Sequence, residues 1–191
     1  MCHRLAYKYL KLMQLDFKSS VKHEIDTRCW KLAIYPLIET FRAALRNAEH
    51  TNNLSSAGLC LSDSDEDHSE NIRHYFAEFI GVAQEFYTAL KTTLQQLEAK
   101  YATPNGGLAR AVQVPRWHRC IGILGDLARY RWLHKLDSDD PSLPPTEWLV
   151  VARRYYREAI DLGPGNGKMY NQLALLSGGR GLESLYYYSK R

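Results

Sequence analysis

The sequence predicts an all-α protein, and three observations lead to this fold class. Apolar residues recur at spacings of three and four in every ordered segment, which is the period of an amphipathic helix. No segment shows the strict alternation of apolar and polar residues that a half-buried strand requires. Proline- and glycine-containing stretches divide the helical segments, and most connections are short. Since short connections favour antiparallel packing of neighbouring helices, we expect an antiparallel helical array.

The first hundred residues are predicted to hold two long helices. The first spans about residues 25–48, and Pro36 lies inside it. Because proline removes a backbone donor and crowds the preceding turn, we expect a kink there. The second helix spans about residues 72–101. The apolar face of the first helix is formed by Trp30, Ile34, Leu37, Ile38, Phe41 and Leu45, and that of the second by Tyr75, Phe79, Val82, Phe86, Leu90, Leu94 and Leu97.

Between these helices, residues 52–70 are rich in Asn, Ser and Asp, which predicts a mobile acidic loop. Residues 62–70 hold five acidic residues and no Lys or Arg. Since the whole chain carries a formal charge of +4, removing those five negative charges leaves the rest at +9. A basic body favours an anionic partner such as nucleic acid or a phosphopeptide. On charge alone, a solvated basic surface without a specific partner is an equal alternative.

The second half is predicted to hold four helices, at about residues 117–136, 144–162, 169–176 and 182–190. The segment 152–164 combines small residues, an aromatic pair and a final proline. Tyr170, Leu173 and Ala174 follow this segment at helical spacing. Together they resemble the second helix of one tetratricopeptide unit followed by the first helix of the next, although a generic helical hairpin would show the same spacing. We therefore predict a helical region over residues 1–136 and tetratricopeptide-type helices over residues 144–191, packed together as one unit. The aromatic run at 186–188, with no capping helix after it, predicts that the chain is a fragment or a truncated relative of a longer protein.

Several function classes lack any support in the sequence. No apolar run approaches the roughly 20 residues that span a bilayer, and the first residues lack the apolar core of a secretory signal. We therefore expect no membrane partner and a location in the nucleus, the cytosol or both. The four cysteines and seven histidines show no metal-ligand spacing, so no metal is expected and the cysteines should be buried thiols or residues without a specific role. Without a nucleotide or catalytic fingerprint, we expect no cofactor and a binding module rather than an enzyme.

Two motifs carry a resemblance to a known family. Residues 120–131 read Cys-Ile-Gly-Ile-Leu-Gly-Asp-Leu-Ala-Arg-Tyr-Arg, and residues 164–174 follow the pattern Pro-x-Asn-Gly-x-x-Tyr-Asn-Gln-Leu-Ala. Both resemble motifs of the telomerase-activating Est and nonsense-mediated-decay SMG family. The resemblance implies a 14-3-3-like antiparallel helical array that continues into tetratricopeptide-type hairpins. It also implies a recruitment module that acts in nonsense-mediated mRNA decay or in telomere maintenance.

The first motif also implies a phosphate-binding site. Gly125-Asp126-x-x-Arg129-Tyr130 resembles the segment of 14-3-3 proteins in which the Arg and the Tyr bind phosphoserine. The chemistry is sound on its own, because a guanidinium presents a rigid fork of donors that meets two phosphate oxygens at once. Asp126 precedes Arg129 by three residues and could hold the guanidinium in place. The alternative is that Asp126 and Arg129 form a structural ion pair.

The chain departs from the family pattern at one position of this site. The decay-factor relatives place a phosphate-binding Lys five residues after the Trp that aligns with Trp30, and here that position is Tyr35. We assign supporting roles to Asp126, Lys31 and Tyr35, and expect modest affinity because one cation is missing. The implied partner is a phosphorylated protein, either a helicase-type decay factor or a telomerase component. The alternative function is weak binding of telomeric single-stranded DNA or RNA by the basic surface, and a homo- or heterodimer is left open.

Overall fold

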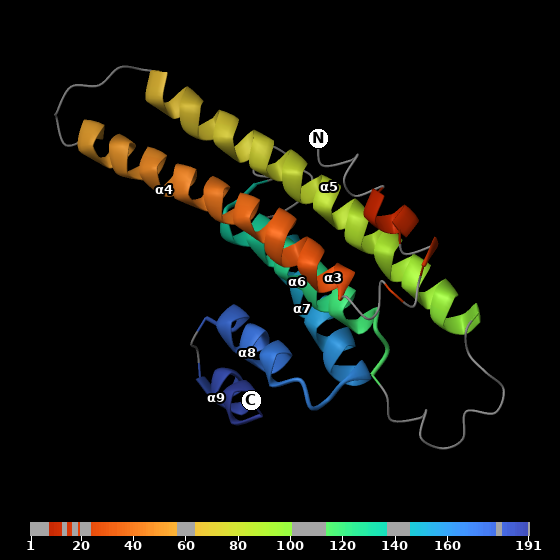
Figure 1. Cartoon of the computed structure of the whole chain (residues 1–191). Helices are drawn as coiled ribbons and strands as arrows, with labels where there is room; N and C mark the ends of the chain where they lie inside the picture. Colours follow the sequence, from red (N-terminus) through yellow and green to blue (C-terminus); the bar gives the residue numbers. More distant parts are fainter. Residues whose placement is uncertain are drawn as a thin grey trace. The chain divides into compact units, whose positions relative to one another are not determined.

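The computed structural model describes residues 8–12, 15–16, 19, 24–56, 64–100, 114–136, 146–178 and 181–190. Every regular element in these ranges is helical, so the predicted all-α class is confirmed (Figure 1). The chain forms two compact units, residues 1–83 and 84–191. The named elements are α3 (Ile25–Cys29), the π-helical turn η1 (Trp30–Ile34), α4 (Tyr35–Ser56), α5 (Ser64–Lys100), α6 (His118–Leu133), α7 (Thr146–Leu162), α8 (Gly167–Leu176) and α9 (Gly181–Ser189).

The predicted first helix contains a π-helical turn, which takes the place of a simple kink at Pro36. The backbone N–H of Tyr35 donates to the carbonyl of Trp30, five residues earlier. Pro36 has no N–H to give to the carbonyl of Leu32, and its ring would crowd that carbonyl in a regular α-helix. A wider turn directly before the proline relieves this conflict, and π turns of this kind are a known way of absorbing it.

The core of the unit formed by residues 1–83 lies between α4 and the first half of α5, which run side by side (Figure 1). The ring of Phe41 stacks on that of Phe76 with centroids 5.0 Å apart, and it also approaches Phe79 at 5.7 Å. The buried apolar residues of this unit are Cys29, Ile34, Ile38, Leu45, Phe76, Ile80 and Ala83.

The predicted apolar faces of the two long helices are wrong at two positions. Tyr75 and Leu37 are exposed, while Phe76 and Ile80 are buried. The α5 sequence carries two adjacent apolar rows, so periodicity alone cannot decide which of them faces the core. The row that meets Phe41 is buried, and a tyrosine on the neighbouring row can keep its hydroxyl in water.

The predicted loop over residues 52–70 is shorter than expected at both ends. α4 continues to Ser56 and α5 begins at Ser64, while residues 57–63 lie outside the described part of the chain. Segments rich in Ser, Asp and Glu suit the first turn of a helix as well as a loop. Composition therefore overestimated the length of this connection.

The unit formed by residues 84–191 is built around the antiparallel pair α6 and α7. At one end, Nε2 of His118 lies 2.7 Å from the carbonyl oxygen of Ala159, and at the other the guanidinium of Arg131 lies over the ring of Trp148. Helices α8 and α9 follow, α8 packing on α7 and α9 on α8. The shared core consists of Ile121, Ala128, Ala152, Tyr156, Ala159, Met169, Leu173 and Leu176. The predicted helix limits in this half are correct to within two or three residues.

Three further observations bear on the predictions. Cys29 and Cys120 are buried and form no disulfide, whereas Cys2 and Cys60 fall outside the described residues. None of the helices the structure describes has both the length and the hydropathy needed to cross a bilayer. The predicted domain division between residues 136 and 144 stays a prediction, and the helices on either side of it, α6 and α7, pack against each other.

Candidate anion-binding site

A buried carboxylate organises polar groups from three helices. Asp126 on α6 is only 5% exposed. The hydroxyl of Tyr156 on α7 donates to its Oδ1 at 2.7 Å, and Nε of Arg129 lies 4.0 Å from the same oxygen. Nζ of Lys168 on α8 lies 3.8 Å from the other oxygen, Oδ2. One negative charge therefore faces two cations and one neutral donor.

Glycines in α6 let the neighbouring helices approach this carboxylate. A Cβ added at Gly125 would lie 2.6 Å from a ring carbon of Tyr156, which real structures do not tolerate. A Cβ at Gly122 would lie 3.1 Å from the terminal methyl of Met169. The first contact places the Tyr156 hydroxyl beside Asp126, and the second holds the first turn of α8 against α6. Close packing at these glycines is thus the reason that residues distant in sequence meet at Asp126.

The electrostatics of the network favour one protonation state. Burial lowers the pKa of Arg129, but the neighbouring Tyr156 and Asp126 raise it by more, so the net shift is upward. Burial and the adjacent Asp126 carboxylate raise the pKa of Tyr156 above its ordinary value. Arg129 is therefore charged, and the Tyr156 hydroxyl keeps its proton as a donor.

The predicted phosphate-binding pair, Arg129 and Tyr130, lies together in this network. The guanidinium carbon of Arg129 lies 4.6 Å from the centre of the Tyr130 ring, a cation–π distance. The Tyr130 ring also stacks on that of His134, and Tyr130 is only 5% exposed. The Arg129 side chain is 18% exposed. The structure thus brings Asp126, Arg129 and Tyr130 together, with Arg129 held between a carboxylate and an aromatic face.

The two other predicted residues belong to the compact unit formed by residues 1–83. Lys31 lies in the π-helical turn, and Tyr35 begins α4; both are exposed. The rings of Trp30 and Tyr35 have centroids 6.0 Å apart. The supporting roles of Lys31 and Tyr35 stay predictions.

Sequence reasoning missed Lys168 and the polar role of Tyr156. Tyr156 belongs to the aromatic pair of the segment 152–164, which indicates helix packing; its ring lies in the core while its hydroxyl binds Asp126. Lys168 lies in the motif of residues 164–174, at one of its variable positions. Only the packing of α8 on the rest of the unit brings it to Asp126, so no local pattern could have found it.

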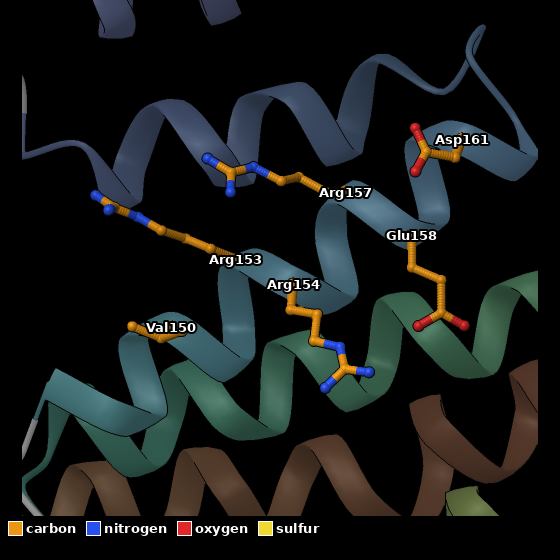
Figure 2. A pocket seen from close by; sticks show the side chains of 6 residues that line it. All are labelled: Val150, Arg153, Arg154, Arg157, Glu158 and Asp161. Atoms are coloured by element: carbon orange, nitrogen blue, oxygen red, sulfur yellow. The ribbon is translucent and has the colours of Figure 1, made fainter.

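A second basic site lies on the outer face of α7. A pocket of about 550 Å³ is lined by Val150, Arg153, Arg154, Arg157, Glu158 and Asp161 (Figure 2). Arg153 donates through Nη2 to the carbonyl of Leu176 at 3.0 Å, and Glu158 lies 3.9 Å from Nζ of Lys91. Arg154 and Arg157 are exposed. The repeat-like pattern of this helix predicts packing and does not single out its outer arginines.

The described residues form no cluster of metal-ligating side chains. Within them, no group of three or more His, Cys, Asp or Glu side chains is placed to hold a metal ion. The two sites are instead rich in Arg and Lys, whose side chains suit phosphate and other oxyanions.

Comparison with known proteins gives two matches to family models. The family described as "Telomerase activating protein Est1" matches residues 24–117. The family described as "Est1 DNA/RNA binding domain" matches residues 152–190, which include α7 from Ala152 onward, α8 and α9.

Individual relatives agree with these matches. The chain is 25% identical to nonsense-mediated mRNA decay factor SMG7 of Arabidopsis thaliana over 91% of its length, and 26% identical to telomerase-binding protein EST1A of Danio rerio over 95%. It is 36% identical to nonsense-mediated mRNA decay factor SMG5 of Homo sapiens, over 37% of its length. The chain covers only 17%, 11% and 6% of these three proteins, respectively.

Proposed function

The chain belongs to the family of telomerase-activating Est1 proteins and nonsense-mediated-decay SMG factors, and on this premise we propose that it is an adaptor that binds a phosphoserine of a protein partner. The relatives are named as decay factors and as a telomerase-binding protein. The proposed partner is accordingly a phosphorylated component of the decay or telomerase machinery, either a helicase-type decay factor or a telomerase component. The adaptor would then act in the nucleus, the cytoplasm or both.

The observation that carries this proposal is the restraint on Arg129. Its guanidinium lies between the Asp126 carboxylate and the Tyr130 ring, with the Tyr156 hydroxyl fixed on the same carboxylate. A guanidinium restrained in this way loses little conformational freedom when it binds a phosphate. Phosphoserine supplies about two negative charges and three acceptor oxygens, which suits the remaining donors of an Arg.

The competing explanation is that Asp126 and Arg129 form only a structural ion pair. Arg129→Gln, combined with a measurement of stability, distinguishes the two, because it removes the charge and keeps a shorter polar side chain. Arg129→Glu would place a second carboxylate beside Asp126. A loss of affinity could then not be separated from a loss of stability.

The test measures fluorescence anisotropy with a phosphoserine peptide, its unphosphorylated twin and a single-stranded oligonucleotide. The wild type should prefer the phosphorylated peptide, and Arg129→Gln should weaken that binding at least tenfold, since charge-assisted bidentate hydrogen bonds are lost. Thermal melts of both proteins serve as the control for folding. Equal affinity of the wild type for both peptides would refute phosphate recognition.

The outer face of α7 favours a second candidate function, the binding of single-stranded DNA or RNA. Arg153, Arg154 and Arg157 lie within residues 152–190, the range that matches the Est1 DNA/RNA binding domain. Arginines on one helix can follow a phosphate backbone without reading bases, and such binding is weak and depends steeply on salt. The oligonucleotide in the same experiment tests this function directly.

A further inference from the structure

We propose that Lys168 is a phosphate-binding residue and supplies the second cation of the Arg129 site. This inference rests on the proposed phosphoserine recognition and names a residue that completes the site. A doubly charged phosphate group is poorly balanced by one Arg alone, so a second cation close to Arg129 is needed.

The geometry places Lys168 and Arg129 on the same carboxylate. Nε of Arg129 lies 4.0 Å from Oδ1 of Asp126, and Nζ of Lys168 lies 3.8 Å from Oδ2. The single charge of Asp126 can balance only one of the two cations. The cluster therefore keeps a net positive charge, and an anion with two charges can add to it without displacing Asp126.

The three charged side chains form a gradient from the interior to the surface. The exposed fraction of the side chain is 7% for Asp126, 18% for Arg129 and 62% for Lys168. Lys168 thus marks the side from which a ligand in water can enter. At 3.8 Å its ammonium is beyond ordinary hydrogen-bonding distance from the carboxylate, so it can turn to a phosphate without breaking a strong bond.

The backbone that carries Lys168 is fixed, although its side chain is exposed. The side chain of Asn166 caps α8 by accepting a hydrogen bond from the backbone N–H of Lys168 at 3.2 Å. The next residue, Met169, is buried and packs close to Gly122 of α6. A flexible ammonium on a fixed backbone suits a ligand that approaches one side of Arg129.

The alternative role for Lys168 is that of a solvent-exposed ion pair with no ligand. Such pairs contribute little to stability, and their loss changes binding only through the overall charge. The two roles differ in their dependence on the phosphate group, on the chemistry of the cation and on its position. An experiment that varies all three separates them.

The experiment uses the full chain and a fluorescein-labelled nine-residue peptide, four alanines on each side of one phosphoserine, together with its serine twin. Anisotropy is measured for the wild type, Lys168→Gln, Lys168→Arg and the control Lys190→Gln. Lys190 is exposed on the last turn of the described chain, and Lys190→Gln removes the same charge from a different place. Thermal melts accompany every variant.

The expected result is a five- to tenfold loss of affinity for the phosphopeptide in Lys168→Gln, about the effect of one charge-assisted hydrogen bond. Lys168→Arg should stay within about twofold of the wild type, and Lys190→Gln should change nothing beyond twofold. All melting temperatures should be close to that of the wild type, because the Lys168 ion pair is largely exposed.

Three outcomes overturn the inference. If Lys168→Gln binds the phosphopeptide as tightly as the wild type, Lys168 is only a surface ion pair, and phosphoserine recognition by Arg129 still stands. If Lys168→Gln and Lys190→Gln weaken binding equally, the effect is one of total charge. If the wild type does not prefer the phosphopeptide over its twin, the proposed function fails and the role of Lys168 fails with it.

Discussion

The inner and outer faces of α7 use polar side chains in opposite ways. On the inner face, Tyr156 is fully buried and its hydroxyl is committed to Asp126. On the outer face, Arg154 and Arg157 are exposed beside the acidic Glu158 and Asp161 (Figure 2). A buried polar group needs a partner in one fixed geometry, whereas an exposed one is satisfied by water. The inner face should therefore control the stability and precision of the Arg129 site, and the outer face should control salt-dependent association.

The largest expected effect comes from forcing Tyr156 away from Asp126. Gly125→Ala places a Cβ 2.6 Å from a ring carbon of Tyr156, and a shift of this ring is costly because it is buried and its hydroxyl is bonded to Asp126. Overpacking together with a strained hydrogen bond to a carboxylate costs about 3 kcal/mol, and the better helix propensity of Ala returns about 1 kcal/mol. We expect urea denaturation to show a free energy of unfolding lower by about 2 kcal/mol.

The matched control for this variant is Gly122→Ala in the same helix. It gains the same helix propensity, but its Cβ meets only the flexible end of Met169, at 3.1 Å. Its stability should stay within about 1 kcal/mol of the wild type. If both variants destabilise the protein equally, contact with Tyr156 is not what Gly125 provides, and the inner face is less constrained than its geometry indicates.

The second prediction isolates the hydrogen bond itself. Tyr156→Phe keeps the ring in the core and removes the donor to Asp126, which should lower the free energy of unfolding by about 1.5 kcal/mol at neutral pH. Phosphopeptide affinity should fall less than in Arg129→Gln, because Arg129 keeps its own contact with Asp126. Urea denaturation and peptide anisotropy measure the two effects.

The same variant has a characteristic pH dependence. In the folded protein the pKa of Tyr156 is raised above its ordinary value of 10.0, so the unfolded chain loses this proton first as the pH rises. The stabilisation from Tyr156 is therefore complete below about pH 10 and declines above it. The stability difference between the wild type and Tyr156→Phe should shrink as the pH rises from about 10 to 11. A difference that stays constant over this range would contradict the raised pKa.

The same two faces show what sequence could and could not predict. Periodicity and turn residues predicted the helices of residues 118–189. Gly163 and Pro164 follow the end of α7, and glycines separate α8 from α9. The spacing of Asp126 and Arg129 predicted their contact, since residues three apart share a helix face. The hydrogen bond from Tyr156 and the approach of Lys168 depend on how α7 and α8 pack on α6, and that register is a tertiary property. The outer arginines were visible in the sequence but were overlooked, because their pattern is that of any solvated helix face.

Substitutions on the outer face should have the smallest effect on stability, in contrast to those that disturb Tyr156. The double variant Arg154→Gln and Arg157→Gln removes two exposed charges, so its free energy of unfolding should stay within about 0.5 kcal/mol of the wild type. Arg153 is left intact, because its hydrogen bond to the carbonyl of Leu176 ties α7 to the end of α8. Phosphopeptide binding should not change beyond twofold, since Arg129 and Lys168 are untouched.

Association with a single-stranded oligonucleotide should respond strongly to the same double variant. Each phosphate contact with a single strand contributes about 0.7 to the slope of log affinity against log salt, so losing two contacts should reduce the slope by about 1.4. Anisotropy titrations between about 50 and 200 mM salt measure this slope, with Lys135→Gln as the control, because Lys135 is exposed and lies outside residues 152–190. An unchanged slope would show that the α7 arginines do not touch the nucleic acid. If the double variant instead lost phosphopeptide binding, the two basic sites would act as one binding surface, and the two faces of α7 would not differ in function.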